Sequence, residues 1–390
     1  MVDQPLQIAG LLALGLATAG SAYMLFAGAR LRALFGTRAS ATPGGQAGGQ
    51  ESGAPAITVL KPLYGDEPGL EAALASLLDQ DYAGEVQVIF GLQDPADPAL
   101  AIAQRLRDAH PECDIGVVVD PRPHGTNRKV ANLINMVAQA RHELIVLADS
   151  DITASTDYLR RVVEPLARPE VGVVTCAYSG LGLTGVWSRL AAMDLSYRFL
   201  PSVAVGVSLG LAKPCMGSTI ALRRAVLREI GGFEAFADKL ADDYAIGESV
   251  RAAGYRSLVA SVLVAHGCAE ASLSELLAHE LRWAKTVRGV DPAGFAGSVV
   301  THPLPWALLG VLLLRGAPGA LAILMVALMC RAWMLRQAEK VAAPVPGAWW
   351  LFPARDMLSL IVFVGSFFVR TVQWRGARFR VDARGDLSGI

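Results

Sequence analysis

Charged residues are scarce in this sequence. They make up 18% of the 390 residues, whereas hydrophobic residues make up 53%, and both fractions depart from those of an ordinary soluble protein in the membrane direction. The 35 basic and 35 acidic residues cancel, so the composition gives no indication of nucleic acid as a partner. The chain is long enough to bury a core, as one large domain or two small ones.

Cysteine is also rare, and its five positions follow no spacing typical of a metal site. An odd and unpatterned set does not suit a disulfide framework. The cysteines therefore indicate a reducing compartment. They are Cys113, Cys176, Cys215, Cys268 and Cys330.

The apolar residues concentrate towards the two ends of the chain. No charged residue occurs between Ile8 and Gly28, a stretch long enough to cross a hydrocarbon core of about 30 Å at about 1.5 Å per residue. No Lys or Arg precedes it, and Arg30, Arg32 and Arg38 follow it, so a transmembrane helix fits better than a signal peptide. By the positive-inside rule these arginines place the next segment in the cytoplasm. We therefore expect residues 1–36 to be a transmembrane anchor.

A second apolar region runs from Pro303 to Leu335, and a third from Met357 to Val369. The sequence "RGAPG" interrupts the second region, and one long broken span and a tight helical hairpin are both consistent with it. We assign residues 291–372 to a C-terminal transmembrane region and 373–390 to a basic cytoplasmic tail. Arginines near the C-terminus favour an even number of crossings after the middle domain, and we expect two. They are Arg370, Arg375, Arg378, Arg380 and Arg384.

The middle of the chain, residues 56–290, alternates short apolar runs with helical patterns. The segment before it, 37–55, is rich in Gly, Ala, Ser and Gln and is expected to be a flexible linker. The alternation predicts an α/β domain: an open, mainly parallel sheet covered by helices on both faces. Ligands of such sheets bind beyond the carboxyl ends of the strands. The expected strands are 56–60, 85–92, 115–120 and 143–148, and the expected helices are 69–79, 98–109 and 129–140.

Two aspartates, Asp149 and Asp151, directly follow the fourth expected strand in "VLADSDIT". On an extended segment, residues two apart face the same way, so their carboxylates are expected to converge while Ser150 points away. Oxygen donors of this kind suit Mg²⁺ or Mn²⁺, which usually complete their coordination with substrate phosphates. A turn or a helix cap, where Asp and Ser are common, explains the same residues equally well.

Two further acidic sites occur. Asp94, in "QDPADP", follows the second expected strand and so lies at the same sheet edge, although the prolines also suit a plain turn. Asp242 and Asp243 begin the helical pattern of "LADDYAIGESVRAAGY", where helix capping accounts for one of them. Because adjacent carboxylates repel, a raised pKa is expected there, which is what a general base needs.

The stretch "HELRWAKTVRG" lies in a helical pattern that begins at Leu273, with His279, Arg282 and Trp283 on one face. Arginine binds phosphate with two hydrogen bonds, and a neighbouring aromatic ring can cover a sugar or a base. A basic amphipathic helix on the bilayer surface explains the same pattern. A site at the membrane surface would need both properties.

Taken in order, these motifs resemble those of the membrane glycosyltransferases with a GT-A fold that are related to ceramide glucosyltransferase. The family pattern is an Asp after an early strand, an Asp-rich strand end, an acidic-Asp-Tyr segment and a (Gln/Arg)-x-x-Arg-Trp motif. The sequence is similar to it over about residues 57–290, with His279 where Gln or Arg is usual. The matching positions are Asp94, Asp149 with Asp151, Asp243 in "ADDY", and Arg282 with Trp283 in "HELRW".

The sequence is more similar still to the hopanoid-biosynthesis branch of bacterial transferases, which put N-acetylglucosamine from a UDP donor onto a bacteriohopanetetrol side chain. The resemblance implies a multi-pass protein of the inner (cytoplasmic) membrane, with its catalytic domain facing the cytoplasm. The stretches that carry it are "LKPLYGDEPGL", "FGLQDPADPA", "GTNRKVANLINM", "LADSDI", "CMGSTIALRR", "FADKLADDYAIGE" and "CAEASLSELLAHELRWAKTVRGVDP".

The resemblance also implies roles for single residues, with Mg²⁺ or Mn²⁺ as the cofactor. The role of His279 stays open, and Lys129 is a candidate donor contact for which a solvated lysine at a helix start is nearly as good an explanation. The implied roles are uracil or ribose binding for Asp94, diphosphate binding for Asp149, metal binding for Asp149 and Asp151, general base for Asp243, and diphosphate binding for Arg282 and Trp283.

The expected reaction is an inverting, one-step displacement in which Asp243 takes the proton from a lipid hydroxyl. The expected partners are a UDP-sugar donor, the bilayer and a membrane lipid acceptor, either a hopanoid or ceramide. Ceramide glucosylation is the first alternative. A processive polysaccharide synthase is a second, although it needs a wide channel and more spans than the two or three expected here. A non-catalytic sugar-nucleotide sensor is the third.

Overall fold

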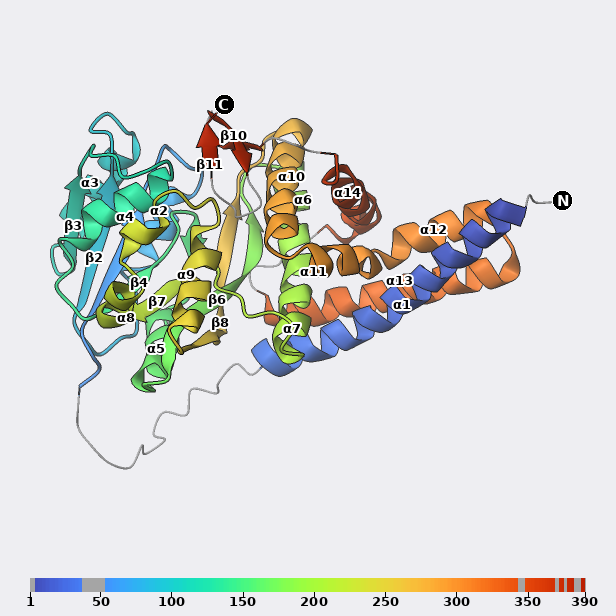
Figure 1. Ribbon diagram of the computed structural model, residues 1–390, viewed down its shortest axis with the longest axis horizontal. Helices are drawn as coiled ribbons and strands as arrows, with labels where there is room; N and C mark the ends of the chain where they lie inside the picture. The colour runs from blue at the N-terminus through green and yellow to red at the C-terminus, as the bar shows by residue number, and fades with distance from the viewer. Residues whose placement is uncertain are drawn as a thin grey trace.

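The computed structural model describes residues 4–36, 53–342, 348–368, 372–374, 377–381 and 387–389. Most of the expected linker lies outside these residues, as do Arg370 and, in the expected tail, Arg375 and Arg384. An α/β domain occupies one end of the molecule, and a bundle of long helices projects from it (Figure 1).

The centre of the domain is an eight-stranded mixed sheet. Its strands are β1 (Ile57–Pro62), β2 (Val86–Leu92), β3 (Asp114–Val119), β4 (Leu144–Leu147), β5 (Ile152–Thr153), β6 (Val171–Gly182), β7 (Ile220–Arg223) and β8 (Arg256–Cys268), in the order β3-β2-β1-β4-β7-β6-β8-β5. The first four pair in parallel, whereas β7 is antiparallel to both β4 and β6. The predicted α/β class is confirmed, and the four predicted strands are present. The four later strands, β5 to β8, were not predicted, and two of them, β5 and β7, run antiparallel to their neighbours.

Helices cover both faces of this sheet, because neighbouring strand residues point to opposite sides. Val59 of β1 belongs to one buried cluster and Leu60 to another, and Val146 and Leu147 of β4 divide in the same way. The first cluster includes α2, α3 and α5, and the second includes α4, α8 and α9. These helices are α2 (Leu70–Ala75), α3 (Ala99–Ala109), α4 (Arg128–Val137), α5 (Tyr158–Val163), α8 (Arg224–Glu229) and α9 (Asp242–Ala252).

One predicted helix, over 69–79, is shorter than expected. α2 ends at Ala75, and turns follow it. The Ser76 hydroxyl donates to the Ala73 carbonyl and accepts from the Ala154 amide, at 2.8 and 3.0 Å. A serine that bonds nearby backbone groups competes with the helical pattern, which explains the early end.

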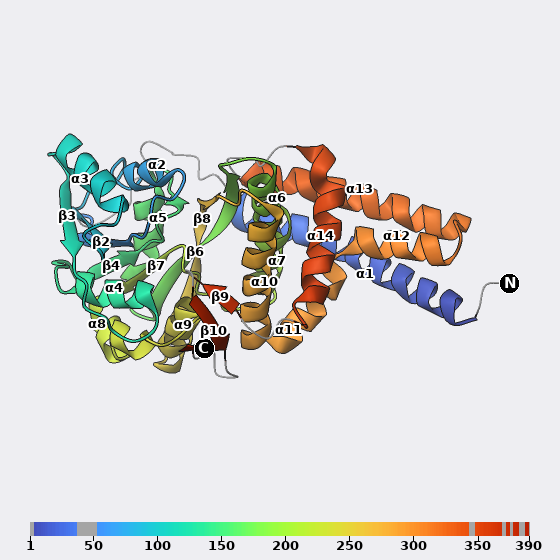
Figure 2. The same ribbon diagram turned by 90° about the horizontal axis from the view of Figure 1, so that it is seen from above.

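The projecting bundle consists of α1 (Gln4–Phe35), α12 (Pro303–Leu313) and α13 (Pro318–Val341) (Figures 1 and 2). The "RGAPG" interruption is the turn between α12 and α13, so the second apolar region is a hairpin and not one broken span. Glycines of α1 allow the close approach: a Cβ at Gly20 would overlap the Val300 carbonyl, and one at Gly28 would overlap the Trp333 ring.

Within the described part of the chain, two helices are long and apolar enough to cross a membrane, Gln4–Phe35 and Pro318–Val341. A pair bent by 62°, Pro292–Thr301 with Pro303–Leu313, adds a third if it counts as one span. The third apolar region forms α14 (Phe352–Gly365), whose 14 residues are fewer than a crossing needs.

A layer of helices separates the sheet from the bundle and runs across the bundle's direction (Figures 1 and 2). It contains α6 (Val186–Asp194), a π-helical turn (Leu195–Phe199), α7 (Leu200–Ser208), α10 (Leu273–Val290) and α14, with the short α11 (Pro292–Gly297) leading from α10 to α12. Beyond α14, where a basic tail was expected, the described backbone forms a small antiparallel sheet of β9 (Val372–Trp374), β10 (Ala377–Val381) and β11 (Leu387–Gly389).

Candidate active site

Asp149 and Asp151 lie in a turn between β4 and β5. The Ile152 amide donates to the Asp149 carbonyl at 3.3 Å, so the backbone turns where an extended segment was expected. As expected, Ser150 is directed elsewhere: its hydroxyl donates to Glu67 Oε2 at 2.6 Å. The two aspartates affect each other's ionisation, and burial together with Asp151 raises the pKa of Asp149, against the effect of a nearby lysine.

Lys61, at the end of β1, donates a hydrogen bond to the backbone at the end of this turn. Its side chain is fully buried, and its Nζ donates to the Ile152 carbonyl at 3.0 Å. Burial lowers the pKa of Lys61 to about 8, although the carboxylates of Asp151, Asp149 and Glu67 act in the opposite direction. Sequence reasoning assigned no role to Lys61 or Glu67, although a lysine at the end of an apolar strand, within "LKPLYGDEPGL", was a signal.

Lys129 connects the turn to the start of α9. Its Nζ lies 2.7 Å from Asp149 Oδ1 and 3.5 Å from Asp242 Oδ2. Asn127 caps α4 by accepting from the Lys129 and Val130 amides, which places Lys129 in the first helical turn. Burial opposes a charge on this lysine, but the surrounding carboxylates raise its pKa above the ordinary value. Lys129, whose side chain is 14% exposed, is therefore not a solvated lysine but the cation of a carboxylate cluster.

Asp243, at the start of α9, is fixed by backbone donors. Its Oδ2 accepts from the Gly217 amide and its Oδ1 from the Tyr244 amide, both at 2.8 Å. Burial and the adjacent Asp242 carboxylate raise the pKa of Asp243 to about 6, against the effects of Lys129 and the two amides. This value suits a group that accepts a proton near neutral pH.

Gly217 lies where the side chains of Asp149, Lys129 and Asp243 meet, and sequence reasoning did not assign it a role. A Cβ at this position would lie 3.0 Å from Asp149 Oδ2, 3.1 Å from Lys129 Nζ and 3.4 Å from Asp243 Oδ2. Three charged side chains from different segments thus converge above one glycine. Only a residue without a side chain leaves that space open.

His266, which was not predicted, lies beside Asp151. Its Nδ1 is 3.4 Å from Asp151 Oδ1, because β8 pairs with β5 so that His266 opposes Ile152. Burial favours the protonated form of Asp151, but His266 and the nearby lysines lower its pKa below the ordinary value. A lone histidine in an apolar strand carries no sequence signal for this contact.

α10 approaches the same place through Trp283. The Trp283 ring centroid is 5.9 Å from that of His266 and 4.9 Å from that of His279. His279 Nδ1 lies 2.5 Å from Oε1 of the buried Glu270. The half-buried Arg282 directly precedes Trp283. The expected helix from Leu273 is present because Ser272 caps it, accepting from the Glu275 amide at 3.2 Å.

A pocket adjoins the carboxylate cluster, between the ends of β1 and β2 and the start of α4. Asp94 lines it while its Oδ1 accepts from the Ala96 amide at 2.8 Å, so this residue also makes the turn considered for it. The Arg128 guanidinium lies 5.4 Å from the Tyr64 ring centroid. The pocket is lined by Pro62, Leu63, Tyr64, Gln93, Asp94, Asp97, Arg128, Lys129 and Asn132.

The Asp151 side of the site fits a divalent cation. Asp151 Oδ1 is buried and has no hydrogen-bond partner within the described residues, apart from its ion pair with His266. Carboxylate oxygen and imidazole nitrogen are both ligands that Mn²⁺ accepts, and carboxylate oxygen suits Mg²⁺. Asp149, by contrast, is paired with Lys129.

The sequence model described as glycosyl transferase family 21 matches residues 14–387. The chain belongs to this family. It is therefore a hexosyltransferase that uses a nucleotide sugar, and its mixed sheet is that of a GT-A-like fold. The predicted place among the ceramide glucosyltransferase-like enzymes is confirmed, and the likeness to the hopanoid branch stays a prediction.

Individual relatives are distant from this family 21 enzyme. Ceramide glucosyltransferase 1 of Caenorhabditis elegans is 20% identical over 344 residues, covering 85% of this chain and 73% of the relative. An N-acetylglucosaminyltransferase of Rhizobium meliloti (strain 1021) is 26% identical over 246 residues, covering 60% of this chain and 55% of the relative. The solved structure of a mannosyltransferase from Pyrobaculum calidifontis, in complex with GDP-Man and Mn²⁺, is 19% identical in sequence with a TM-score of 0.47. The match covers 91% of this chain and 99% of the mannosyltransferase.

Proposed function

We propose that this family 21 enzyme is an inverting transferase that moves N-acetylglucosamine or glucose from a UDP-sugar to a hydroxyl of a membrane lipid, a bacteriohopanetetrol-type hopanoid. One observation carries the proposal. Asp243, with a pKa of about 6, lies across Gly217 from the Lys129–Asp149 pair. A proton acceptor thus lies opposite groups suited to a sugar diphosphate, which is the arrangement that a single displacement requires.

In this mechanism Asp243 accepts the proton of the lipid hydroxyl. The hydroxyl oxygen forms a bond to the anomeric carbon as the bond from that carbon to UDP breaks, and the bonding electrons leave with UDP. Lys129, Arg282 and Trp283 bind the departing diphosphate, while the Gly217 amide keeps the Asp243 carboxylate in place. A divalent cation bound by Asp149 and Asp151, with His266 beside them, would neutralise charge on the diphosphate.

The pocket beside the cluster is assigned to the nucleoside of the donor. Lys129 belongs to both the pocket and the carboxylate cluster, so a nucleotide seated there extends its phosphates towards Asp149. Asp94 lines the pocket and is the proposed partner of the uracil or ribose. Tyr64, with Arg128 against its ring, offers a flat surface next to the base.

The acceptor is proposed to enter along α7 and the loop after it. Leu209 and Leu211 of this loop are 53% and 77% exposed, although both are apolar. α7 lies against the candidate membrane span α1, where the Tyr23 hydroxyl donates to Ser202 Oγ at 3.0 Å. The chain then leads within a few residues to Gly217 and the proposed base. This route connects the bilayer, the lipid and a cytoplasmic donor site.

A transfer assay with the full chain in liposomes tests the proposal. The donors are UDP-GlcNAc and UDP-Glc, the acceptors are bacteriohopanetetrol and ceramide, and mass spectrometry identifies the product. We expect one N-acetylglucosamine or glucose on the hopanoid. Glucosylceramide as the sole product would establish the first alternative instead, and a polymer would indicate a processive synthase.

A base variant separates an enzyme from a sugar-nucleotide sensor. D243N is expected to bind UDP-sugar and to lose transfer, because the amide cannot accept the proton. Turnover equal to that of the wild type would reject Asp243 as the base. Binding without transfer by the wild type, under all donor and acceptor pairs, would favour the sensor. Lipid mass spectrometry of a deletion strain then shows which glycolipid disappears.

A further inference from the structure

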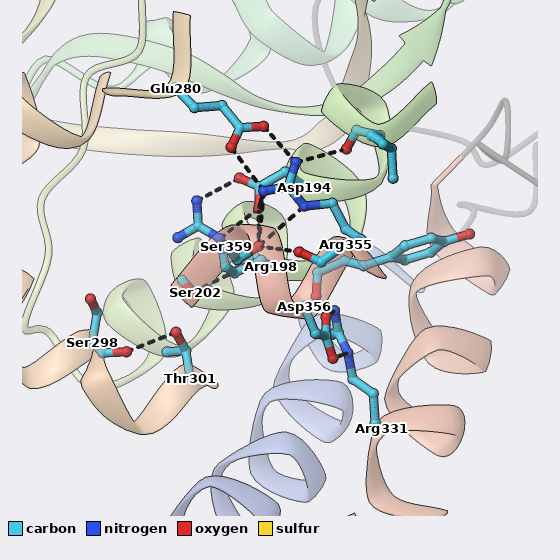
Figure 3. Close-up of polar contacts among 12 residues, drawn as sticks. Asp194, Arg198, Ser202, Glu280, Ser298, Thr301, Arg331, Arg355, Asp356 and Ser359 are labelled. Atoms are coloured by element: carbon cyan, nitrogen blue, oxygen red, sulfur yellow. Dashed lines mark hydrogen bonds and ion pairs between the residues drawn. The ribbon is translucent and has the colours of Figure 1, made fainter. Parts of the chain in front are cut away.

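Arg355, at the start of α14, is buried between the sheet domain and the bundle, with a side chain that is 1% exposed. Its guanidinium donates from Nη1 to Glu280 Oε1 at 2.6 Å and from Nη2 to Glu280 Oε2 at 2.8 Å (Figure 3). Two parallel hydrogen bonds to one carboxylate fix the orientation of the partners as well as their separation. The pair therefore sets the relation between α14 and α10.

The remaining contacts of Arg355 tie it to α6 and to its own helix. It donates to the Leu190 carbonyl at 3.3 Å and to Ser359 Oγ at 3.1 Å, and its Nη2 lies 3.6 Å from Asp194 Oδ1. Asp194 is paired in turn with Arg198, at 2.5 and 2.7 Å. The charges of the two arginines and the two carboxylates cancel within the cluster. Because the four side chains come from α6, the π-helical turn, α10 and α14, their ion pairs link these helices.

Glu280 occupies a distinctive place on α10. It directly follows His279 and stands two positions before Arg282, and successive helical residues are about 100° apart around the axis. α10 is thus held on two sides, by Glu280 with Arg355 and by His279 with Glu270. Ion pairs on two sides oppose rotation of the helix about its axis.

We propose that Arg355 is a positioning residue of the active site, which sets the rotation of α10 through Glu280 and so places Arg282 and Trp283 against the donor diphosphate. The inference rests on the proposed function, because it takes α10 as the donor-binding helix. It also assigns α14, an apolar segment first considered as a membrane span, to the support of the catalytic site.

A second buried ion pair provides a matched control. Arg331 of α13 donates to both oxygens of Asp356, with side chains 4% and 7% exposed. Arg331 Nη1 also donates to the Tyr197 carbonyl at 2.7 Å. Among the described residues, the hydrogen bonds of this pair reach α14 and the π-helical turn but not α10. It shares the burial and geometry of the Arg355–Glu280 pair without the link to the site.

The experiment compares R355K and E280Q with R331K and D356N in the full chain. Calorimetry with UDP and Mn²⁺ gives the Kd, and steady-state kinetics give KM for the UDP-sugar and kcat. All four variants are expected to lower Tm. Only R355K and E280Q are expected to raise the Kd for UDP and the KM, by about tenfold. The double variant should be no worse than the poorer single one, since both act through one contact.

Unchanged UDP affinity in both R355K and E280Q would overturn the proposal. An equal rise of the Kd for UDP in R331K and D356N would also overturn it. If R355K does not fold, E280Q decides, because its amide keeps the size of the side chain. Failure of the proposed function looks different. A wild type that makes no glycolipid while R355K still loses UDP affinity would reject the acceptor but support the positioning role.

Discussion

The ammonium group of Lys129 lies 2.7 Å from Asp149 Oδ1 and 3.5 Å from Asp242 Oδ2, so one cation joins the turn after β4 to the start of α9. Its removal in K129M leaves the buried Asp242 carboxylate and the partly exposed Asp149 carboxylate without their partner. We expect a loss of about 3–5 kcal/mol in the free energy of unfolding, with a lower Tm. K129R keeps the charge and should lose less. Equal Tm values for K129M and the wild type would contradict the pairing.

D243N should be inactive and yet more stable at neutral pH. Because the folded-state pKa of Asp243 is raised to about 6, its favourable contribution is present below the unfolded pKa of about 4 and is lost as pH rises through about 6. At pH 8 the ionised carboxylate then costs roughly 2–3 kcal/mol, which asparagine avoids. Thermal unfolding should show a higher Tm than wild type at pH 8, with the difference gone at pH 4.

D242N should shift the pH dependence of transfer. After burial, the Asp242 carboxylate is the largest cause of the raised pKa of Asp243. Without it, the pKa of Asp243 falls, so the base stays ionised to lower pH. We expect the acid limb of the kcat profile, near pH 6 in the wild type, to move to lower pH. If the acid limb of the D242N profile stays near pH 6, the limb does not report the ionisation of Asp243.

Removal of divalent cations should abolish transfer, and Mn²⁺ should restore it. D151N should bind Mn²⁺ at least tenfold more weakly, since the buried Asp151 Oδ1 loses its charge. Electron paramagnetic resonance of free Mn²⁺ measures this binding without any turnover. D108N, at an exposed position on α3, is the control. Full activity after exhaustive chelation would remove the metal from the mechanism.

G217A should damage catalysis more than folding. The added Cβ would lie 3.0 Å from Asp149 Oδ2 and 3.1 Å from Lys129 Nζ, so these groups must shift by a few tenths of an ångström. Catalysis depends on positions at that scale, and we expect kcat to fall by about tenfold or more. Circular dichroism and Tm should change little. A normal kcat would mean that the three charged groups have more freedom than their geometry suggests.

Much of the framework could be predicted because its signals are local. Short apolar runs marked the first four strands, and the polar residues after them marked the edge where Asp94 and Asp149 lie. The helical pattern around "HELRWAKTVRG" predicted the start of α10 at Leu273. Each of these features depends on residues that are near one another in the chain.

The supporting contacts could not be predicted because they join distant segments. Lys61 and Ile152 are separated by 91 positions, and Ser150 and Glu67 by 83. The contact of His266 with Asp151 depends on how β8 pairs with β5, which is a property of the assembled sheet. The turn at Asp149 has the same origin. The antiparallel pairing of β7 with β4 and β6 is likewise a property of the assembled sheet.

The bundle also constrains the order in which the molecule is assembled. α1 is made first, yet the surfaces that cover Gly20 and Gly28 belong to Val300, Pro303 and Trp333, near the other end of the chain. Until these residues have been synthesised, Gly20 and Gly28 lack the contacts that cover them in the structure. The catalytic domain is therefore enclosed as one long loop when the first helix and the late hairpin meet.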